Sequence, residues 1–261
     1  MDAKINFNRI MPERKRSQVT IFIIFGLIFV VLILIIIVLR FPNNTPIVDD
    51  NTPQSFIESC TKDAIKEAIE RVSENAGSLK PQISVMYKNI NRTYLCYTSS
   101  NFKPCVNQQP KLIEHIETEI NNSITPKIIN CFNAMDSQLK NRYELETGDL
   151  SIVTKLEPRQ VVVTVYKKMI LKRGESTREF NSYKTVYTHP IFNLAEIANI
   201  IVNQETQFCN FDSLGYMILY PDYDITKFKT GNSDIIYNIK DRKTNEDFNF
   251  AIRTCILPPG H

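Results

Sequence analysis

The pattern of apolar and polar residues changes along the chain, and its first part is an unbroken apolar run. Residues Val19–Leu39 contain no charged side chain, and only Thr20 and Gly26 interrupt the large apolar ones. At about 1.5 Å of rise per residue, the run would cover about 30 Å, the thickness of a bilayer's hydrocarbon core. The pattern therefore predicts a transmembrane helix over residues 19–39.

The charges beside this run predict its orientation. Residues 1–18 are basic, whereas the linker 40–54 carries Asp49 and Asp50 and no cation after Arg40. The positive-inside rule places residues 1–18 in the cytoplasm and residues 41–261 outside, with the ectodomain over residues 55–261, as a single-pass protein of the cell membrane. A cleaved secretory signal is the alternative, but its apolar region would span about 7–15 residues and end at a small-residue site that this sequence does not offer.

Helical spacing of apolar residues follows in three later segments. Ile57, Ile65, Ile69 and Val72 belong to a stripe that predicts a helix over about 54–75, which Gly77 would end. A second helix is predicted over residues 111–124, and Pro126 is expected to break or kink it. A capping box at residues 193–196 predicts the start of a third helix, which would reach about residue 205.

Alternation with a period of two predicts strands in the remaining sequence. Residues 82–99 are predicted to form a hairpin with its turn at Asn89–Arg92. Further strands are expected at Leu150–Leu156, Gln160–Lys172, Phe180–Thr188, Tyr216–Tyr220, Ser233–Lys240 and Asp247–Cys255. The prediction is an α+β ectodomain of mostly antiparallel strands packed with about three helices, with a candidate subdivision near residues 135–148.

All six cysteines lie beyond the apolar run, and their even number predicts three disulfides in an oxidising compartment. They are Cys60, Cys96, Cys105, Cys131, Cys209 and Cys255. Six cysteines allow 15 connectivities. Cys96 and Cys105 would close a short local loop, Cys60–Cys131 could join two helices, and Cys209–Cys255 would then remain. The sequons at Asn43, Asn91 and Asn121 are candidate glycosylation sites that fit the same compartment.

Composition argues against several classes of partner. The chain carries a net charge of +3, and residues 1–40 carry +4, so the outer part carries −1. A near-neutral outer domain argues against a nucleic-acid partner. The chain has only 7 glycines, and none lies in a phosphate-binding pattern, so no nucleotide and no other cofactor is predicted.

The residues with chemical potential form no recognisable catalytic or metal-binding motif. His115 is interpreted as a solvated surface histidine, and the cationic cluster Lys167, Lys168, Lys172 and Arg173 as the solvated face of an edge strand. The acids Asp222, Asp224 and Asp234 match no calcium loop. The tyrosines and phenylalanines are placed like core and cross-strand residues rather than like a carbohydrate-stacking platform. No catalytic residue and no metal ligand is therefore predicted, and the protein is not expected to be an enzyme.

The N-terminus has one more specific pattern. Residues 14–22 combine a short basic leader, a small residue, glutamine and an immediate apolar helix. This pattern resembles the leader of archaeal type IV pilin-like proteins, which have class III signal peptides. The resemblance implies processing between Ser17 and Gln18 and assembly through the apolar helix. The sequence departs from the pattern at Phe22, where pilins usually carry glutamate.

The remaining chain is similar to uncharacterised single-pass membrane proteins of small-genome archaea, through SQVTIFIIFG, ESCTKDAIKEAIE and the closing NFAIR. The resemblance implies topology and compartment, and no activity. The favoured interpretation is a membrane-anchored surface protein with a structural or binding ectodomain, whose partners are the bilayer and other envelope or surface proteins. The alternative is a processed pilin-like subunit. The sequence leaves the oligomeric state open.

Overall fold

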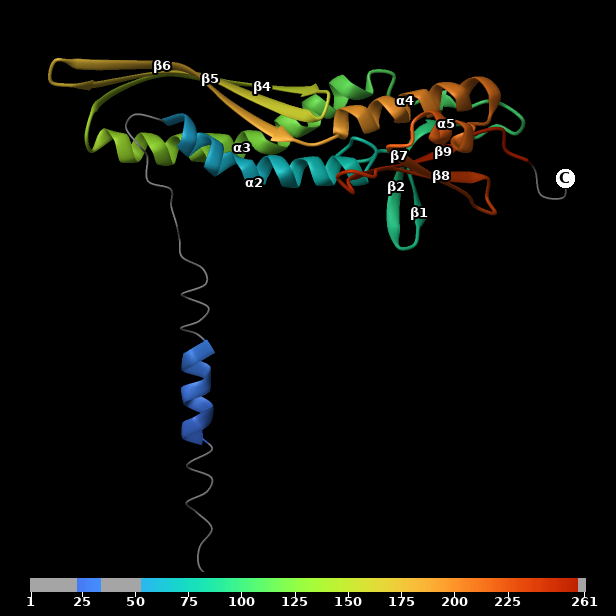
Figure 1. Ribbon diagram of the computed structural model, residues 1–261, viewed down its shortest axis with the longest axis horizontal. Coiled ribbons are helices and arrows are strands. Elements are labelled where there is room, and N and C mark those ends of the chain that lie inside the picture. Colours follow the sequence, from blue (N-terminus) through green and yellow to red (C-terminus); the bar gives the residue numbers. More distant parts are fainter. Residues whose placement is uncertain (1–22, 34–52, 258–261) are drawn as a thin grey trace, which may run out of the picture. The chain divides into compact units, whose positions relative to one another are not determined.

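The computed structural model describes residues 23–33 and 53–257, which belong to two separate compact units (Figure 1). Residues 23–33 are helical, and their side chains are exposed. No helix within the described ranges is long and apolar enough to cross a membrane. The rest of the span predicted over residues 19–39, the basic segment 1–18 and residues 40–52 of the linker lie outside the described residues.

Residues 53–257 form an α+β domain, as the sequence predicts (Figure 1). The helices of this range are α2 (Pro53–Glu74), α3 (Leu112–Lys140), α4 (Ile191–Phe208) and α5 (Ser213–Leu219). Its strands are β1 (Ser84–Tyr87), β2 (Ile90–Tyr97), β3 (Val106–Asn107), β4 (Glu144–Glu157), β5 (Gln160–Arg173), β6 (Ser176–Thr188), β7 (Tyr223–Lys229), β8 (Asp234–Asp241) and β9 (Asp247–Arg253).

The three long strands β4, β5 and β6 form an antiparallel sheet that lies along α2 and α3 (Figure 1). Val161, Val163 and Val165 of β5 are buried on the face that meets the helices, which confirms the predicted buried face. Alternation places every second side chain of a strand on one face, so these valines form a continuous apolar row. The candidate subdivision near residues 135–148 falls on the end of α3 and the start of β4.

The second sheet is mixed and has the strand order β1-β2-β9-β8-β7, and the short strand β3 also pairs with β2, on the side away from β9. Its pairs are antiparallel except for β2 and β9, which run parallel. Phe248, Phe250 and Ile252 of β9 are fully buried on one face, which packs against α4. The opposite face, which we call the open face, carries a small buried cluster of Tyr94, Ile236 and Ala251.

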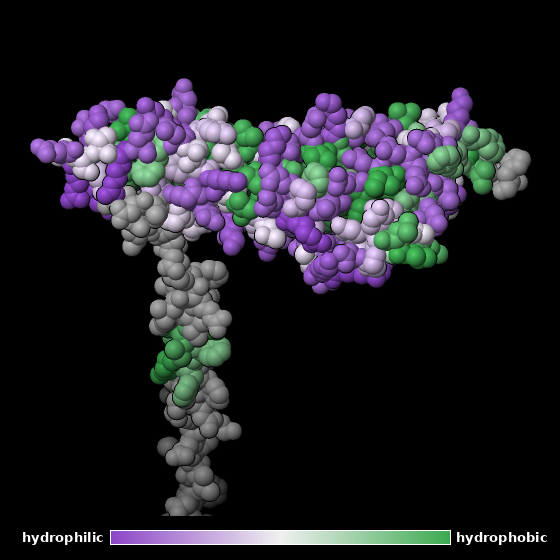
Figure 2. All heavy atoms as spheres, turned by 45° about the horizontal axis from the view of Figure 1, so that its top comes forward, coloured by the Kyte–Doolittle hydropathy of each residue, from purple (hydrophilic) through white to green (hydrophobic). Residues whose placement is uncertain are grey.

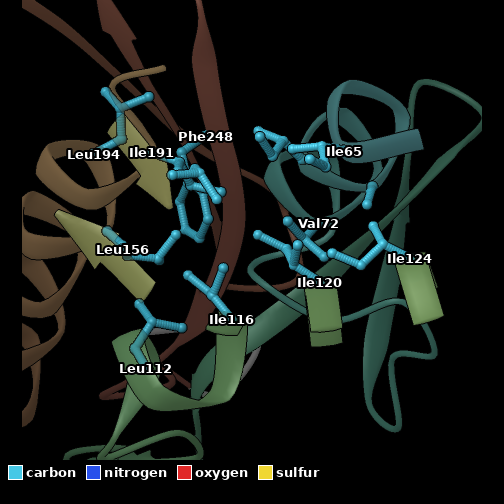
Figure 3. Packing of buried hydrophobic residues seen from close by; sticks show 14 of the residues in the cluster. Ile65, Val72, Leu112, Ile116, Ile120, Ile124, Leu156, Ile191, Leu194 and Phe248 are labelled. Carbon is cyan, nitrogen blue, oxygen red and sulfur yellow. The ribbon is translucent and has the colours of Figure 1, made fainter. Parts of the chain in front are cut away.

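Side chains from both sheets and three helices meet in one hydrophobic core (Figure 3). Ile65 and Val72 of α2 lie opposite Ile120 and Ile124 of α3, and Phe248 of β9 lies beside Ile191 of α4. The core cluster therefore includes residues from both sides of the domain. Burial of each such side chain stabilises the fold by about 1.5–3 kcal/mol.

Three disulfides staple the domain, and they are the three pairs that the sequence favours. Cys60–Cys131 joins α2 to α3. Cys96–Cys105 closes the loop after β2, and Cys209–Cys255 joins the end of α4 to the end of β9. Disulfides form and persist in oxidising compartments, so this framework indicates an extracytoplasmic domain.

The predicted break of the second helix is wrong, because α3 continues through Pro126 to Lys140. Proline removes one backbone donor and costs about 3 kcal/mol inside a helix. Beyond it, however, Ile128, Phe132 and Leu139 are fully buried. Their combined burial outweighs the lost hydrogen bond, and Cys131 therefore lies within the helix rather than after it.

The strand predicted at Tyr216–Tyr220 is also wrong, because these residues lie in and just after helix α5. A short apolar run has no period that distinguishes strand from helix. The deciding signal is Asp212, whose carboxylate accepts the N–H of Gly215 and caps the helix. The strand that follows, β7, begins at Tyr223 and was not predicted.

The hairpin turn and the start of α4 both differ from the prediction. The turn of the hairpin is Lys88-Asn89 rather than Asn89–Arg92, and both turn residues have positive φ. Helix α4 begins at Ile191, so Asn193 is inside it and not at its cap. The Asn193 side chain instead accepts the N–H of Arg159 from the turn between β4 and β5, which ties that turn to the helix.

The cationic cluster does not form the face of an edge strand, because β5 is the central strand of its sheet. Lys167 lies on the buried face, where its ammonium is 3.1 Å from the Asp136 carboxylate and 5.1 Å from the centre of the Phe132 ring. Lys172 pairs with Glu146 on the neighbouring strand, and this pair raises the pKa of Lys172. The lysines are therefore paired rather than free to bind an anion.

We expect Lys167→Ala to lower the free energy of unfolding by about 3 kcal/mol, because it leaves the Asp136 carboxylate buried without its partner. The double variant Lys167→Met/Asp136→Leu should lose less than the single one. Lys172→Ala, which breaks an exposed pair, should lower the free energy of unfolding far less than Lys167→Ala does. Urea unfolding measures all three, and equal losses for Lys167→Ala and Lys172→Ala would contradict the assignment.

Gly77 is the second position where a single change should be costly. Its φ of +87° lies in the region that favours glycine, and its N–H bonds the Val72 carbonyl at the end of α2. A Cβ here would lie 2.7 Å from Cγ1 of Ile116 on α3. Gly77→Ala should therefore lower the free energy of unfolding by about 1–3 kcal/mol. Gly231→Ala, where a Cβ meets nothing within 4 Å, is the matched control.

Candidate functional site

The open face of the mixed sheet carries an unusual row of polar and aromatic side chains. Alternation puts Tyr237 and Phe250 into the core and turns Asn238 and Asn249 to the other side. Phe228 of β7 pairs in register with Ile236 of β8, so it also belongs to this open face. The face therefore combines aromatic rings with amides.

The two outer strands of the sheet meet across this face. The rings of Tyr87 on β1 and Phe228 on β7 lie 5.1 Å apart between centroids and are tilted by 39°, although three strands separate β1 from β7 in the sheet. The sheet is therefore strongly curved, and its hollow encloses about 270 Å³. The hollow, which we call the sheet pocket, is lined by Tyr87, Lys88, Ile90, Arg92, Thr226, Phe228, Ile236, Asn238, Asp247 and Asn249.

A short hydrogen-bonded ladder forms the polar wall of the sheet pocket. The Asn238 amide donates to Asp247 at 2.7 Å and to Asn249 at 2.9 Å. Arg92 donates to the Glu74 carbonyl at 3.2 Å, and Lys88 lies over the Tyr87 ring, 5.3 Å from its centre. Among the described residues, neither of these two cations forms an ion pair. The pocket therefore holds two cations and one carboxylate.

The far end of the same face is closed by a charged network. Asp234 accepts hydrogen bonds from the Tyr94 hydroxyl at 2.7 Å and from the Arg253 guanidinium at 2.8 Å. Burial, together with the neighbouring Asp234 carboxylate, raises the pKa of Tyr94 well above its usual value. The hydrogen bond to Asp234 likewise raises the pKa of Arg253. These groups satisfy one another and leave Asp234 in a structural role.

The other two acids noted in the sequence do not join Asp234 in a common site. Asp222 pairs with Lys243, and Asp224 pairs with Arg242. Within the described ranges, no group of three or more histidines, cysteines or acids could hold a metal ion. The structure therefore separates these acids into individual ion pairs.

A second, smaller cavity of about 160 Å³ lies beside the start of α3. The Ser78 hydroxyl is 2.9 Å from Nε2 of His115, and the Glu119 carboxylate accepts the N–H of Leu79 at 2.7 Å. The prediction of a solvated surface histidine is therefore wrong. Since His115 and Glu119 hold consecutive residues after Gly77, the contacts fix this loop to α3. In the part of the chain that the structure describes, no carboxylate bonds the other ring nitrogen of His115.

Apolar side chains gather at the end of the domain, beside the grey C-terminal residues in Figure 2. Phe102, Val106, Phe208 and Leu257 are all more than half exposed. The disulfide Cys209–Cys255 and a backbone bond from Phe102 to Ile256 bring these segments together. Helix α5 also exposes apolar side chains, because none of its residues is buried.

The predicted modification sites have different environments. Asn91 is exposed on β2, whereas Asn121 is half-buried on α3 and accepts a hydrogen bond from Thr154 at 3.0 Å. Asn43 and the predicted processing site at Ser17 and Gln18 lie outside the described residues. Carbohydrate attaches to the amide nitrogen, and the exposed Asn91 offers a more accessible one than the half-buried Asn121.

No family model, no curated protein and no solved structure matches the chain. The structure itself defines the class of protein as a disulfide-stapled, extracytoplasmic α+β domain.

A buried histidine predicts how stability depends on pH. Nδ1 of His189 accepts the N–H of Ile191 at 3.1 Å, so Nε2 carries the hydrogen and faces Glu246 at 3.2 Å. Burial lowers the pKa of His189 below its usual value of 6.5, although the carboxylates of Glu246, Glu70 and Asp241 oppose this shift. Between this lowered pKa and 6.5, the unfolded chain therefore binds a proton that the folded domain does not.

The free energy of unfolding should consequently fall as the pH is lowered from 7.5 to 5.5, by at most about 1.4 kcal/mol per pH unit from this group. Replacing the imidazole by an amide, His189→Asn, removes the titrating group and should flatten the profile. Urea unfolding at several pH values measures the slope. A variant with the same slope as the parent protein would show that other groups produce the pH dependence.

Proposed function

We propose that this protein is a single-pass membrane protein that presents a binding ectodomain at the cell surface. The observation that carries the proposal is the disulfide-stapled domain beyond an uncharged apolar run of membrane-spanning length. The N-terminal segment 1–18 would face the cytoplasm, and residues 19–39 would anchor the chain. The sheet pocket supports a binding role, because it gathers aromatic, amide and charged groups in one hollow.

The proposed partners are the lipid bilayer, through the apolar run, and other envelope or surface proteins, through the ectodomain. The exposed apolar residues at the end of the domain support contact with another protein, since contiguous apolar surface marks interaction sites. The proposed role is binding rather than catalysis.

A specific sequence feature favours a second candidate, a processed pilin-like subunit. The basic leader with Ser17 and Gln18 directly before the apolar run supports it. In this alternative the chain would begin at Gln18, and the apolar helix would pack against copies of itself in a filament. The two candidates share the ectodomain and differ in the fate of residues 1–17.

The intact mass of the protein purified from membranes should separate these candidates. We expect the mass of the full chain, six hydrogens lighter before reduction than after it, because three disulfides are closed. Protease added to intact cells should then digest the ectodomain and spare a tag at the N-terminus. A chain that begins at Gln18 would favour the pilin-like subunit. Six free thiols, or a protected ectodomain, would contradict the surface location.

A further inference from the structure

We propose that the sheet pocket binds an acidic sugar, a pyranose ring that carries a carboxylate, such as a uronic acid unit of a surface polysaccharide. The inference deepens the proposed function and rests on it, because it names the ligand class of the binding ectodomain. It is carried by three properties of the pocket: its aromatic wall, its amide ladder and its charge.

The aromatic wall suits the apolar face of a sugar ring. Tyr87 and Phe228 close the hollow from opposite edges of the sheet, and Phe228 remains 50 % exposed. The C–H groups on one face of a pyranose carry a partial positive charge, and the face of an aromatic ring is negative. The sequence alone favours cross-strand roles for these residues, whereas the curvature of the sheet turns both rings onto the pocket.

The amide ladder suits the hydroxyl groups of the same ring. Asn238 uses its N–H donors within the ladder, whereas its carbonyl oxygen has no partner among the described residues. The amide nitrogen of Asn249 is likewise without a side-chain acceptor in the described ranges. Sugar hydroxyls both donate and accept hydrogen bonds, so a wall that offers both kinds of atom is complementary to them. The lining amides come from adjacent strands, which fixes their spacing.

The charge of the pocket favours an acidic ligand over a neutral one. Lys88 and Arg92 contribute two cations, and Asp247 is the one carboxylate among the lining residues that the structure describes. Asp247 is held by the Asn238 amide, which leaves the cations on the hairpin side of the pocket to face the ligand. A carboxylate beside a guanidinium gains a charge-assisted hydrogen bond.

The size of the pocket agrees with a single sugar unit. Its 270 Å³ lies just below the range of about 300–1,000 Å³ that holds drug-sized ligands. The Ser78–His115 cavity is smaller, at 160 Å³, and its polar groups already hold the loop to α3. A longer polysaccharide would extend from the pocket across the exposed hairpin residue Ile90.

The test is calorimetry on the full chain in lipid nanodiscs, which avoids detergents that carry sugar headgroups. The probes are tetragalacturonic acid and its neutral counterpart, the α-1,4-linked tetramer of galactose. We expect the acidic tetrasaccharide to bind at least tenfold more tightly than the neutral one at low salt, and to weaken as salt rises. Phe228→Ala should weaken this binding at least tenfold, and Arg92→Gln should remove the preference for the acidic probe.

Matched controls keep the result interpretable. Tyr166→Ala removes an aromatic ring of β5 that is 51 % exposed and does not line the pocket, and it should leave binding unchanged. Each variant must retain three disulfides and the unfolding temperature of the parent. Absence of binding to the acidic probe, equal binding of the neutral probe, or unchanged binding by Phe228→Ala would each overturn the proposal. The calorimetry uses purified protein and does not depend on where the protein lies in the cell. A negative result would therefore not contradict the proposed surface location.

Discussion

Both sheets of the domain depend on the packing of α2 against α3. The two helices bury isoleucines and a valine against each other, and Cys60–Cys131 holds them together. In the long sheet, α3 contacts β4 and α2 contacts β6. Helix α2 also contacts β9 of the mixed sheet. Because the helix pair contacts both sheets, it positions the mixed sheet relative to the long sheet. Gly77 permits the close approach of the two helices where α2 ends.

Buried charges then connect the remaining layers. Glu205 of α4 is fully buried and binds Lys227 of β7 at 3.0 Å and the Tyr237 hydroxyl of β8. Asp241 at the end of β8 is also buried, and Arg159 from the turn between β4 and β5 donates to it at 3.1 Å. A buried carboxylate is costly unless hydrogen bonds satisfy it, so each group restricts its neighbours to one arrangement. Together they fix β7 and β8, and with them the sheet pocket.

The sequence was most informative where one physical signal acted alone. The stripe at Ile57, Ile65 and Val72 predicted α2 because a helix buries every third or fourth residue. The valines of β5 likewise predicted a strand, and the cysteine spacing favoured the observed pairs. The sequence misled where two signals competed, as at Pro126, where local proline chemistry opposed distant burial. It also misled at Lys167, because alternation shows which face a residue occupies but not what covers that face.

The candidate site required more than the sequence could supply. Tyr87 and Phe228 lie on strands at opposite edges of one sheet, and no local pattern relates positions so far apart in the chain. The meeting of Ser78 with His115 has the same origin, since α2 and α3 must pack before the loop reaches the imidazole.

The sequence by itself determined the uncharged apolar run, the even number of cysteines that predicts three disulfides, and the α+β class, because each depends on composition or on a period of two or 3.6 residues. Only the tertiary structure decided the sheet order, the partners of the buried charges and the curvature that makes a pocket. Those features depend on contacts between residues far apart along the chain, and such contacts form only when the helix pair and both sheets close on a common core.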